Sequence, residues 1–295
     1  LYFGLSTKPI VQDTTLLEEE IVNVEVWTYD EPRLYTVQEL QVKNDKKKAY
    51  DAVYHLNSNK LIQIATTAYP NAQITDEGNA TYALLNNPEP YQLESQWTGR
   101  SHSDYAIVNV ETGEISKALA NVTSYARISP KSNYMFGYHA PDSTWFTYDV
   151  KNNKRVDFTK GEVFYNELSD YPDFPSSYGS AGWTTDDKEF LVYDRYDIWS
   201  FNPKTESFKR LTKGRENNTV YRYIRLDREE KSLDKSKKWL LSTFNDKTKN
   251  SGYAEFNPKN NAVKQLVDAP FRYTTRPQKA KNSNNVLFTK QSFKV

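Results

Sequence analysis

The chain has 295 residues, and its 39 Lys and Arg nearly balance 38 Asp and Glu, which leaves a net charge of +1. This balance gives no electrostatic reason to expect nucleic acid or an anionic membrane as the main partner. The absence of Cys excludes disulfides, thiolate zinc sites and a cysteine nucleophile. The mean hydropathy of −0.82 is low. However, 22 Tyr, 14 Phe and 6 Trp are typical of a folded, β-rich protein rather than a disordered chain.

The two ends of the sequence both resemble strands. The chain opens with Leu1-Tyr2-Phe3-Gly4, without the basic segment of a signal peptide, and it nears its end with Val286-Leu287-Phe288-Thr289-Lys290. No stretch approaches the roughly 18 apolar residues that a membrane-spanning helix needs. Because domains seldom begin and end within strands, we expect the chain to be a fragment of a longer protein.

A first repeating marker is an apolar or aromatic strand that ends in Asn or Asp and is followed by a short polar turn. Asn and Asp suit this position because their side chains can close a local turn on the backbone. The marker recurs at Asn57, Asn109, Asp149, Asn202 and Asn257, and successive positions lie 52, 40, 53 and 55 residues apart.

A second marker is a polar turn that leads into another apolar strand. Asp186-Asp187-Lys188, for example, leads into Phe190-Leu191-Val192-Tyr193. The strands after these turns are predicted to start at residues 81, 134, 190, 239 and 286, at steps of 53, 56, 49 and 47. Two markers with a shared period of about fifty residues indicate a structural repeat.

Each repeat holds about four short strands, which is typical of a β-propeller blade. The sequence therefore predicts an all-β fold, a β-propeller of four-stranded antiparallel blades that is incomplete. Long amphipathic helices are absent from the pattern, and a β-sandwich is the alternative. The predicted divisions are a part-blade with an insertion over 1–66, blades over about 67–121, 122–161, 162–214 and 215–270, and a part-blade over 271–295.

Two motifs resemble the propeller of large bacterial serine peptidases of the prolyl oligopeptidase family. They are Tyr178-Gly179-Ser180-Ala181-Gly182-Trp183 and Tyr193-Asp194-Arg195-Tyr196-Asp197-Ile198-Trp199. The remaining resemblance lies in Leu1–Gly4, Lys8-Pro9-Ile10, Asp13–Leu16, Val26–Asp30 and Leu287–Phe293, in the same order as in that family.

The resemblance implies a propeller that is joined to a C-terminal α/β-hydrolase domain, which carries the Ser-Asp-His triad. Ser180 is followed by Gly182 but preceded by Tyr178, and no serine of this chain has the Gly-x-Ser-x-Gly pattern of a nucleophile elbow. We therefore expect a part without catalytic residues, which gates and positions peptides for the hydrolase domain of the same parent chain. The resemblance also implies export to the periplasm or secretion, and no cofactor or metal is expected. A stand-alone propeller that binds protein or glycan ligands is the alternative.

Asp194, Arg195 and Asp197 are the first candidate contacts with substrate or with another domain. Arg195 could bind a substrate carboxylate, or it could form a structural ion pair between neighbouring strands. A strand period of two places Tyr193, Arg195 and Asp197 on one face, and Asp194, Tyr196 and Ile198 on the other.

The second candidate element is the irregular aromatic segment Tyr165–Tyr178, which contains Tyr171, Phe174 and Tyr178. Loops on a rigid scaffold commonly carry binding residues, so these rings are predicted to contact a ligand or a partner. The alternative is a lid that packs one blade on the next.

Two weaker patterns invite a functional interpretation. Glu18-Glu19-Glu20 could hold a substrate ammonium group, as paired glutamates do in dipeptidyl peptidases, but a solvated turn or short helix is the favoured interpretation. His55, His102 and His139 are scattered, and none has a carboxylate at the spacing typical of a metal site or triad, although His102 with Asp104 comes nearest.

Overall fold

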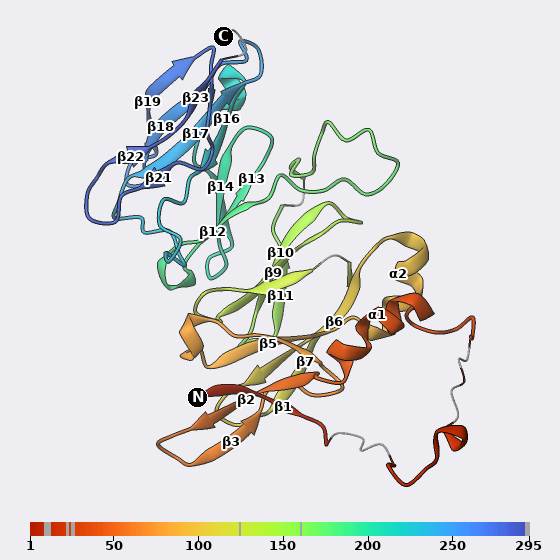
Figure 1. Ribbon diagram of the computed structural model, residues 1–295. Coiled ribbons are helices and arrows are strands. Elements are labelled where there is room, and N and C mark those ends of the chain that lie inside the picture. Colours follow the sequence, from red (N-terminus) through yellow and green to blue (C-terminus); the bar gives the residue numbers. More distant parts are fainter. Residues whose placement is uncertain (9–12, 22–23, 25–26, 124, 160, 293–295) are drawn as a thin grey trace. The chain divides into compact units, whose positions relative to one another are not determined.

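The computed structural model describes residues 1–8, 13–21, 24, 27–123, 125–159 and 161–292 (Figure 1). Pro9, Ile10, Val26 and Phe293, which carry part of the family resemblance, lie outside the described residues. The chain divides into two compact units, Leu1–Ile128 and Ser129–Val295. No helix among the described residues is long and apolar enough to cross a membrane.

The first unit contains two antiparallel sheets. One is three-stranded, in the order β1-β2-β3, and the other is four-stranded, in the order β4-β5-β6-β7. Their strands are β1 (Tyr2–Ser6), β2 (Ala49–His55), β3 (Lys60–Gln63), β4 (Asn71–Gln73), β5 (Tyr82–Asn87), β6 (His102–Asn109) and β7 (Ile115–Thr123), and the unit ends with β8 (Ala126–Ile128). Small and branched apolar residues such as Val53, Leu85 and Val108 fill the core.

Two helices of the first unit are absent from the sequence prediction. They are α1 (Tyr35–Asp45) and α2 (Gln92–Thr98), and neither contains a buried residue. Gly99 ends α2 with a φ of 68°, a conformation that glycine adopts without the steric cost of a side chain. Short 3-10 helices complete the unit: η1 (Glu18–Glu20), η2 (Asp76–Gly78) and η3 (Glu89–Tyr91).

The second unit continues the antiparallel pattern. Strands β9 (Tyr134–His139), β10 (Thr144–Asp149) and β11 (Lys154–Asp157) are neighbours in the order β11-β10-β9. Two four-stranded sheets follow, β12-β13-β14-β15 and β16-β17-β18-β19. Their strands are β12 (Ser180–Trp183), β13 (Phe190–Tyr193), β14 (Ile198–Asn202), β15 (Ser207–Arg210), β16 (Thr219–Tyr223), β17 (Trp239–Asn245), β18 (Ser251–Asn257) and β19 (Ala262–Ala269).

Short elements connect and follow these sheets. The 3-10 helices are η4 (Thr185–Asp187) and η5 (Arg215–Asn217). Near the end of the chain, β20 (Arg272–Tyr273) pairs with β23 (Lys290–Gln291), and β21 (Gln278–Lys279) pairs with β22 (Val286–Leu287). The prediction of one continuous strand over Val286–Lys290 is therefore wrong, because the chain changes its pairing partner after Leu287.

The anchors Asn109, Asp149 and Asn202 close turns as predicted. The Asn109 side-chain oxygen accepts hydrogen bonds from the N–H groups of residues 111 and 112, at 2.9 and 3.1 Å. Asp149 and Asn202 each accept from the residues two and three positions later in the same way. These side chains hold the chain at the point where one strand ends and the next begins.

The predicted fold class is confirmed: the chain is an all-β protein with four-stranded antiparallel sheets of the propeller type. Strands begin within one residue of all five positions that the second marker predicts.

Aromatic residues fill the core of the second unit. Tyr134, Trp145, Phe164, Trp183 and Phe190 are buried in one cluster. Trp199 is half-buried at the edge of this cluster and stacks on Phe208, with ring centroids 4.9 Å apart.

Candidate functional site

Asp194–Asp197 form a tight turn between β13 and β14, so the strand alternation that the sequence predicts across these residues is wrong. The Asp194 Oδ1 atom accepts a hydrogen bond from the Tyr196 N–H at 2.8 Å and another from the Asp197 N–H. Its backbone N–H donates to the Asp197 carbonyl at 3.1 Å. A carboxylate that caps its own turn in this way replaces the strand ladder with a local structure.

Asp197 has a fully buried carboxylate, which holds the segment that leads into η5. It accepts hydrogen bonds from the Thr212 hydroxyl at 2.6 Å, from the Gly214 N–H and from the Arg215 N–H at 3.2 Å. Burial raises the pKa of Asp197, and the nearby charge of Asp194 acts in the same direction, whereas the donated hydrogen bonds oppose both.

Arg195 points to a neighbouring strand hairpin. Its Nη2 atom lies 2.9 Å from Oδ2 of Asp246, the residue that follows β17. Both side chains are about one-quarter exposed, at 26% and 24%. The partner of Arg195 is therefore a carboxylate 51 residues away rather than either aspartate of its own turn.

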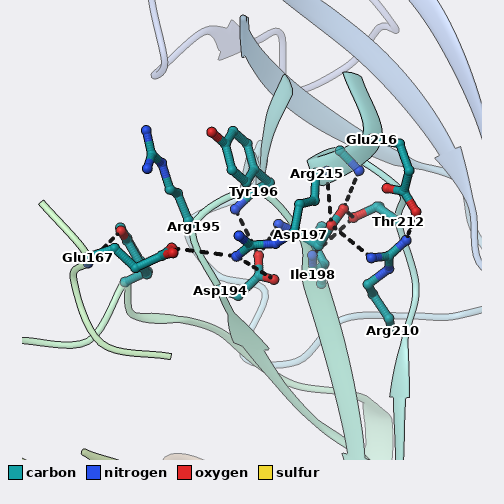
Figure 2. A network of polar contacts seen from close by, with 12 residues as sticks. Glu167, Asp194, Arg195, Tyr196, Asp197, Ile198, Arg210, Thr212, Arg215 and Glu216 are labelled. Carbon is teal, nitrogen blue, oxygen red and sulfur yellow. Dashed lines mark hydrogen bonds and ion pairs between the residues drawn. The ribbon is translucent and has the colours of Figure 1, made fainter. Parts of the chain in front are cut away.

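Arg215 connects the turn to the aromatic segment that precedes β12. Its Nη2 atom lies 3.5 Å from Oε2 of Glu167 and 3.5 Å from Oδ2 of Asp194. Figure 2 shows Arg215 between these two carboxylates, with Arg210 and Glu216 beyond Asp197 on the other side. One guanidinium thus holds two parts of the second unit that are distant in sequence.

Arg222 lies on β16 and donates to three backbone carbonyls. These belong to Tyr221 at 2.8 Å, Asp194 at 2.8 Å and Arg195 at 3.1 Å. No carboxylate of the described residues forms an ion pair with it, and burial lowers its pKa. The guanidinium carbon lies 4.6 Å from the centroid of the Tyr193 ring and 5.8 Å from that of Tyr178, so the rings take the place of a counter-ion.

The aromatic segment is fixed at its base. The Tyr178 hydroxyl accepts a hydrogen bond from the Glu167 N–H at 2.9 Å, and the Asn166 N–H donates to the Ser176 carbonyl at 2.7 Å. Towards its middle, in contrast, the Tyr171 and Phe174 side chains are 75% and 44% exposed.

The structure therefore brings some of the sequence candidates together. Asp194, Arg195 and Asp197 share one turn, and Tyr178 joins them through Arg222. Glu167, Arg215, Arg222 and Asp246 also belong to this network but are missing from the sequence candidates. The strand-end position of Asp246, directly after Asn245, is a signal that could have been used.

The remaining candidates lie elsewhere. Glu18–Glu20 form the exposed helix η1, in agreement with the favoured interpretation. The side chain of His55 contacts the Val110 carbonyl and that of His102 contacts Asn121, at 2.9 and 2.8 Å. His139 lies 2.9 Å from Asp142, a pairing that the sequence analysis missed. No group of three possible metal ligands occurs within the part of the chain that the structure describes.

No family model and no curated protein matches the sequence. Similar solved structures include dipeptidyl peptidase 4 of Porphyromonas gingivalis, at 11% identity and a TM-score of 0.43, over 76% of this chain and 37% of that one. The β-propeller domain of the trilobed protease from Pyrococcus furiosus matches at 12% identity and a TM-score of 0.40, over 83% of this chain and 71% of that one. TolB from Acinetobacter baumannii matches at 13% identity and a TM-score of 0.36, over 78% and 56% of the two chains.

The chain thus spans little more than a third of the P. gingivalis peptidase. At these identities and TM-scores the similarities do not assign a function.

Proposed function

We propose that this chain is the propeller portion of a serine peptidase of the prolyl oligopeptidase type, without catalytic residues of its own. In this proposal it gates and positions peptide substrates for an α/β-hydrolase domain of the same parent chain, in the periplasm or outside the cell. The blades correspond to residues 67–121, 122–161, 162–214 and 215–270, with part-blades over 1–66 and 271–295.

One observation supports this proposal above the others. The two motifs that resemble the peptidase family contact the same guanidinium, because the Tyr178 and Tyr193 rings both lie over Arg222. Arg222 also holds the backbone of Asp194 and Arg195, within the second motif. The residues behind the resemblance therefore form one structural unit, as expected if the family's propeller architecture requires them together.

The alternative is a stand-alone propeller that binds protein or glycan ligands. Both proposals predict binding without chemistry by these 295 residues, so the discriminating observation lies in the gene that encodes them. A downstream Gly-x-Ser-x-Gly elbow, followed by Asp and His in an α/β pattern, favours the peptidase. A stop codon or an unrelated domain at that place favours the stand-alone module.

A biochemical test separates the roles of the two parts. A fluorophosphonate probe, which labels activated serines, is incubated with the full-length product of the gene and with the 295-residue chain. We expect labelling of the full-length protein and none of the chain, because no serine of the chain lies in a nucleophile elbow. Stoichiometric labelling of the chain, or an unlabelled full-length protein, contradicts the proposal.

A further inference from the structure

Residues 161–178, here named the acidic aromatic loop, expose several large apolar side chains. Figure 1 shows this loop in green, between β11 and β12. Its exposed large side chains are Val163, Tyr165, Leu168, Tyr171 and Phe174. Exposed apolar side chains that are concentrated in one segment are typical of an interaction surface, since their contact with water is unfavourable.

The two ends of the loop are held by the rest of the second unit. In addition to the hydrogen bonds at its base, the Tyr138 hydroxyl donates to the Pro175 carbonyl at 3.2 Å, and Tyr165 forms a β-bridge with Ser177. Glu167 is held by Arg215. Because these contacts hold both ends of the loop, a ligand that binds to it has to offset only part of the entropic cost of ordering it.

The charge of the loop is entirely negative. It contains Glu162, Glu167, Asp170 and Asp173, and it contains no Lys or Arg. Arg215 partly neutralises Glu167, whereas the exposed Asp170 directly precedes in sequence Tyr171, which has the most exposed ring of the loop. A partner with positive charge next to apolar groups matches this surface, because a cation gains both from carboxylates and from the faces of aromatic rings.

We propose that the acidic aromatic loop binds peptide segments in which Lys or Arg alternates with apolar residues. This inference rests on the proposed function and deepens it, since it gives the propeller a preference for basic peptides. Tyr171 and Phe174 contact the apolar side chains and the stems of the basic residues, and Asp170 contacts their charged groups.

The test measures the fluorescence anisotropy of three labelled peptides with the 295-residue chain. The peptides share the same Leu and Phe residues and carry Lys, Gln or Glu at the positions between them. We expect the Lys peptide to bind about tenfold more tightly than the Glu peptide, as expected for a few exposed charge pairs. Added salt should reduce this difference, because it screens exposed charges.

Two variants locate the binding surface. Asp170→Asn should weaken binding of the Lys peptide by roughly two- to fivefold, the range for one exposed charge pair. Tyr171→Ala should weaken binding of all three peptides. Matched controls are Glu111→Gln and Tyr29→Ala, which alter an exposed carboxylate and an exposed ring outside the loop and should leave binding unchanged.

The possible results separate the inference from the function on which it rests. Equal binding of the three peptides, or no binding of any of them, overturns the inference, whereas the proposed function stands or falls separately with the fluorophosphonate labelling of the full-length protein. Binding that neither loop variant alters also overturns the inference. So does a dimer of the chain that Tyr171→Ala dissociates, because a second copy then occupies the loop.

Discussion

Replacement of Asp197 by Ala tests whether the buried carboxylate organises the site. The side chain is fully buried, and three donors point at it: the Thr212 hydroxyl, the Gly214 N–H and the Arg215 N–H. A buried donor that loses its acceptor costs about 1–3 kcal/mol, and loss of one member of a buried charged network costs about 3–5 kcal/mol. The raised pKa of Asp197 indicates that its ionised form is itself unfavourable, which lowers the net effect. We expect a loss of about 3 kcal/mol in the free energy of unfolding.

The assay is urea unfolding of the 295-residue chain, monitored by tryptophan fluorescence. The control is Glu216→Gln, which alters an exposed carboxylate that pairs with Arg210 in the same network and should cost less than about 1 kcal/mol. A double-mutant cycle with Thr212→Ala measures the coupling across the 2.6 Å hydrogen bond directly. A loss below about 1 kcal/mol for Asp197→Ala, with no coupling to Thr212, would refute the assignment of the carboxylate as an organising group.

Three further predictions use other parts of the second unit. Trp183→Ala should destabilise the chain by about 3–5 kcal/mol in urea melts, and by more than Trp199→Ala, because Trp183 is 2% exposed and Trp199 is half-buried; an equal effect of the two changes contradicts this ranking. Burial raises the pKa of the Tyr193 hydroxyl to about 12, so the unfolded chain loses this hydroxyl proton at a lower pH than the folded chain, and the free energy of unfolding should fall between about pH 10 and 12. Tyr193→Phe should reduce that fall. Identical alkaline stability profiles of the two proteins in urea melts contradict this prediction. Arg215→Ala should speed hydrogen exchange at the Glu167 and Asn166 amides. The control Lys213→Ala, a substitution of a nearby basic residue, should leave the exchange rates of both amides unchanged. Unchanged rates in both variants contradict a link through Arg215.

The repeat was predictable because its signals are local. An Asn or Asp at a strand end bonds to N–H groups two and three residues later, as Asn109 and Asn202 do. The geometry of such a turn depends on a few adjacent residues, so its sequence pattern survives without knowledge of the rest of the fold. The same reasoning predicted where each following strand begins.

The turn at Asp194–Asp197 was predicted wrongly for a related reason. Aromatic and apolar residues on both sides favour a strand, and this preference hides the ability of Asp194 to bond to its own backbone. The helix α1 was missed because its apolar residues do not follow a helical period and none of them is buried.

The contacts of Arg195, Arg215 and Arg222 could not be predicted from the sequence, for another reason. Apart from the adjacent Tyr221 carbonyl, which accepts from Arg222, their partners lie from 21 to 51 residues away and are set by how distant segments pack. Local patterns carry no information on such pairings. Such patterns could identify the turn as rich in charged residues, but they could not identify the partner of each arginine.

The charged residues at and around the Asp194–Asp197 turn stabilise the fold, whereas the side chains at the middle of the acidic aromatic loop are exposed. Asp194 and Asp197 accept hydrogen bonds from the chain itself, and Arg222 donates to three carbonyls, so a substrate that used them would have to break bonds that hold the turn. Arg195 faces the same competition from Asp246. We therefore infer that the family-like motifs build the support, and that the acidic aromatic loop, held to that support by Arg215, presents exposed aromatic side chains. Tyr171 and Phe174 are then the sequence candidates that we propose to contact a ligand, whereas Asp194, through Arg215, helps to hold the base of the loop at Glu167.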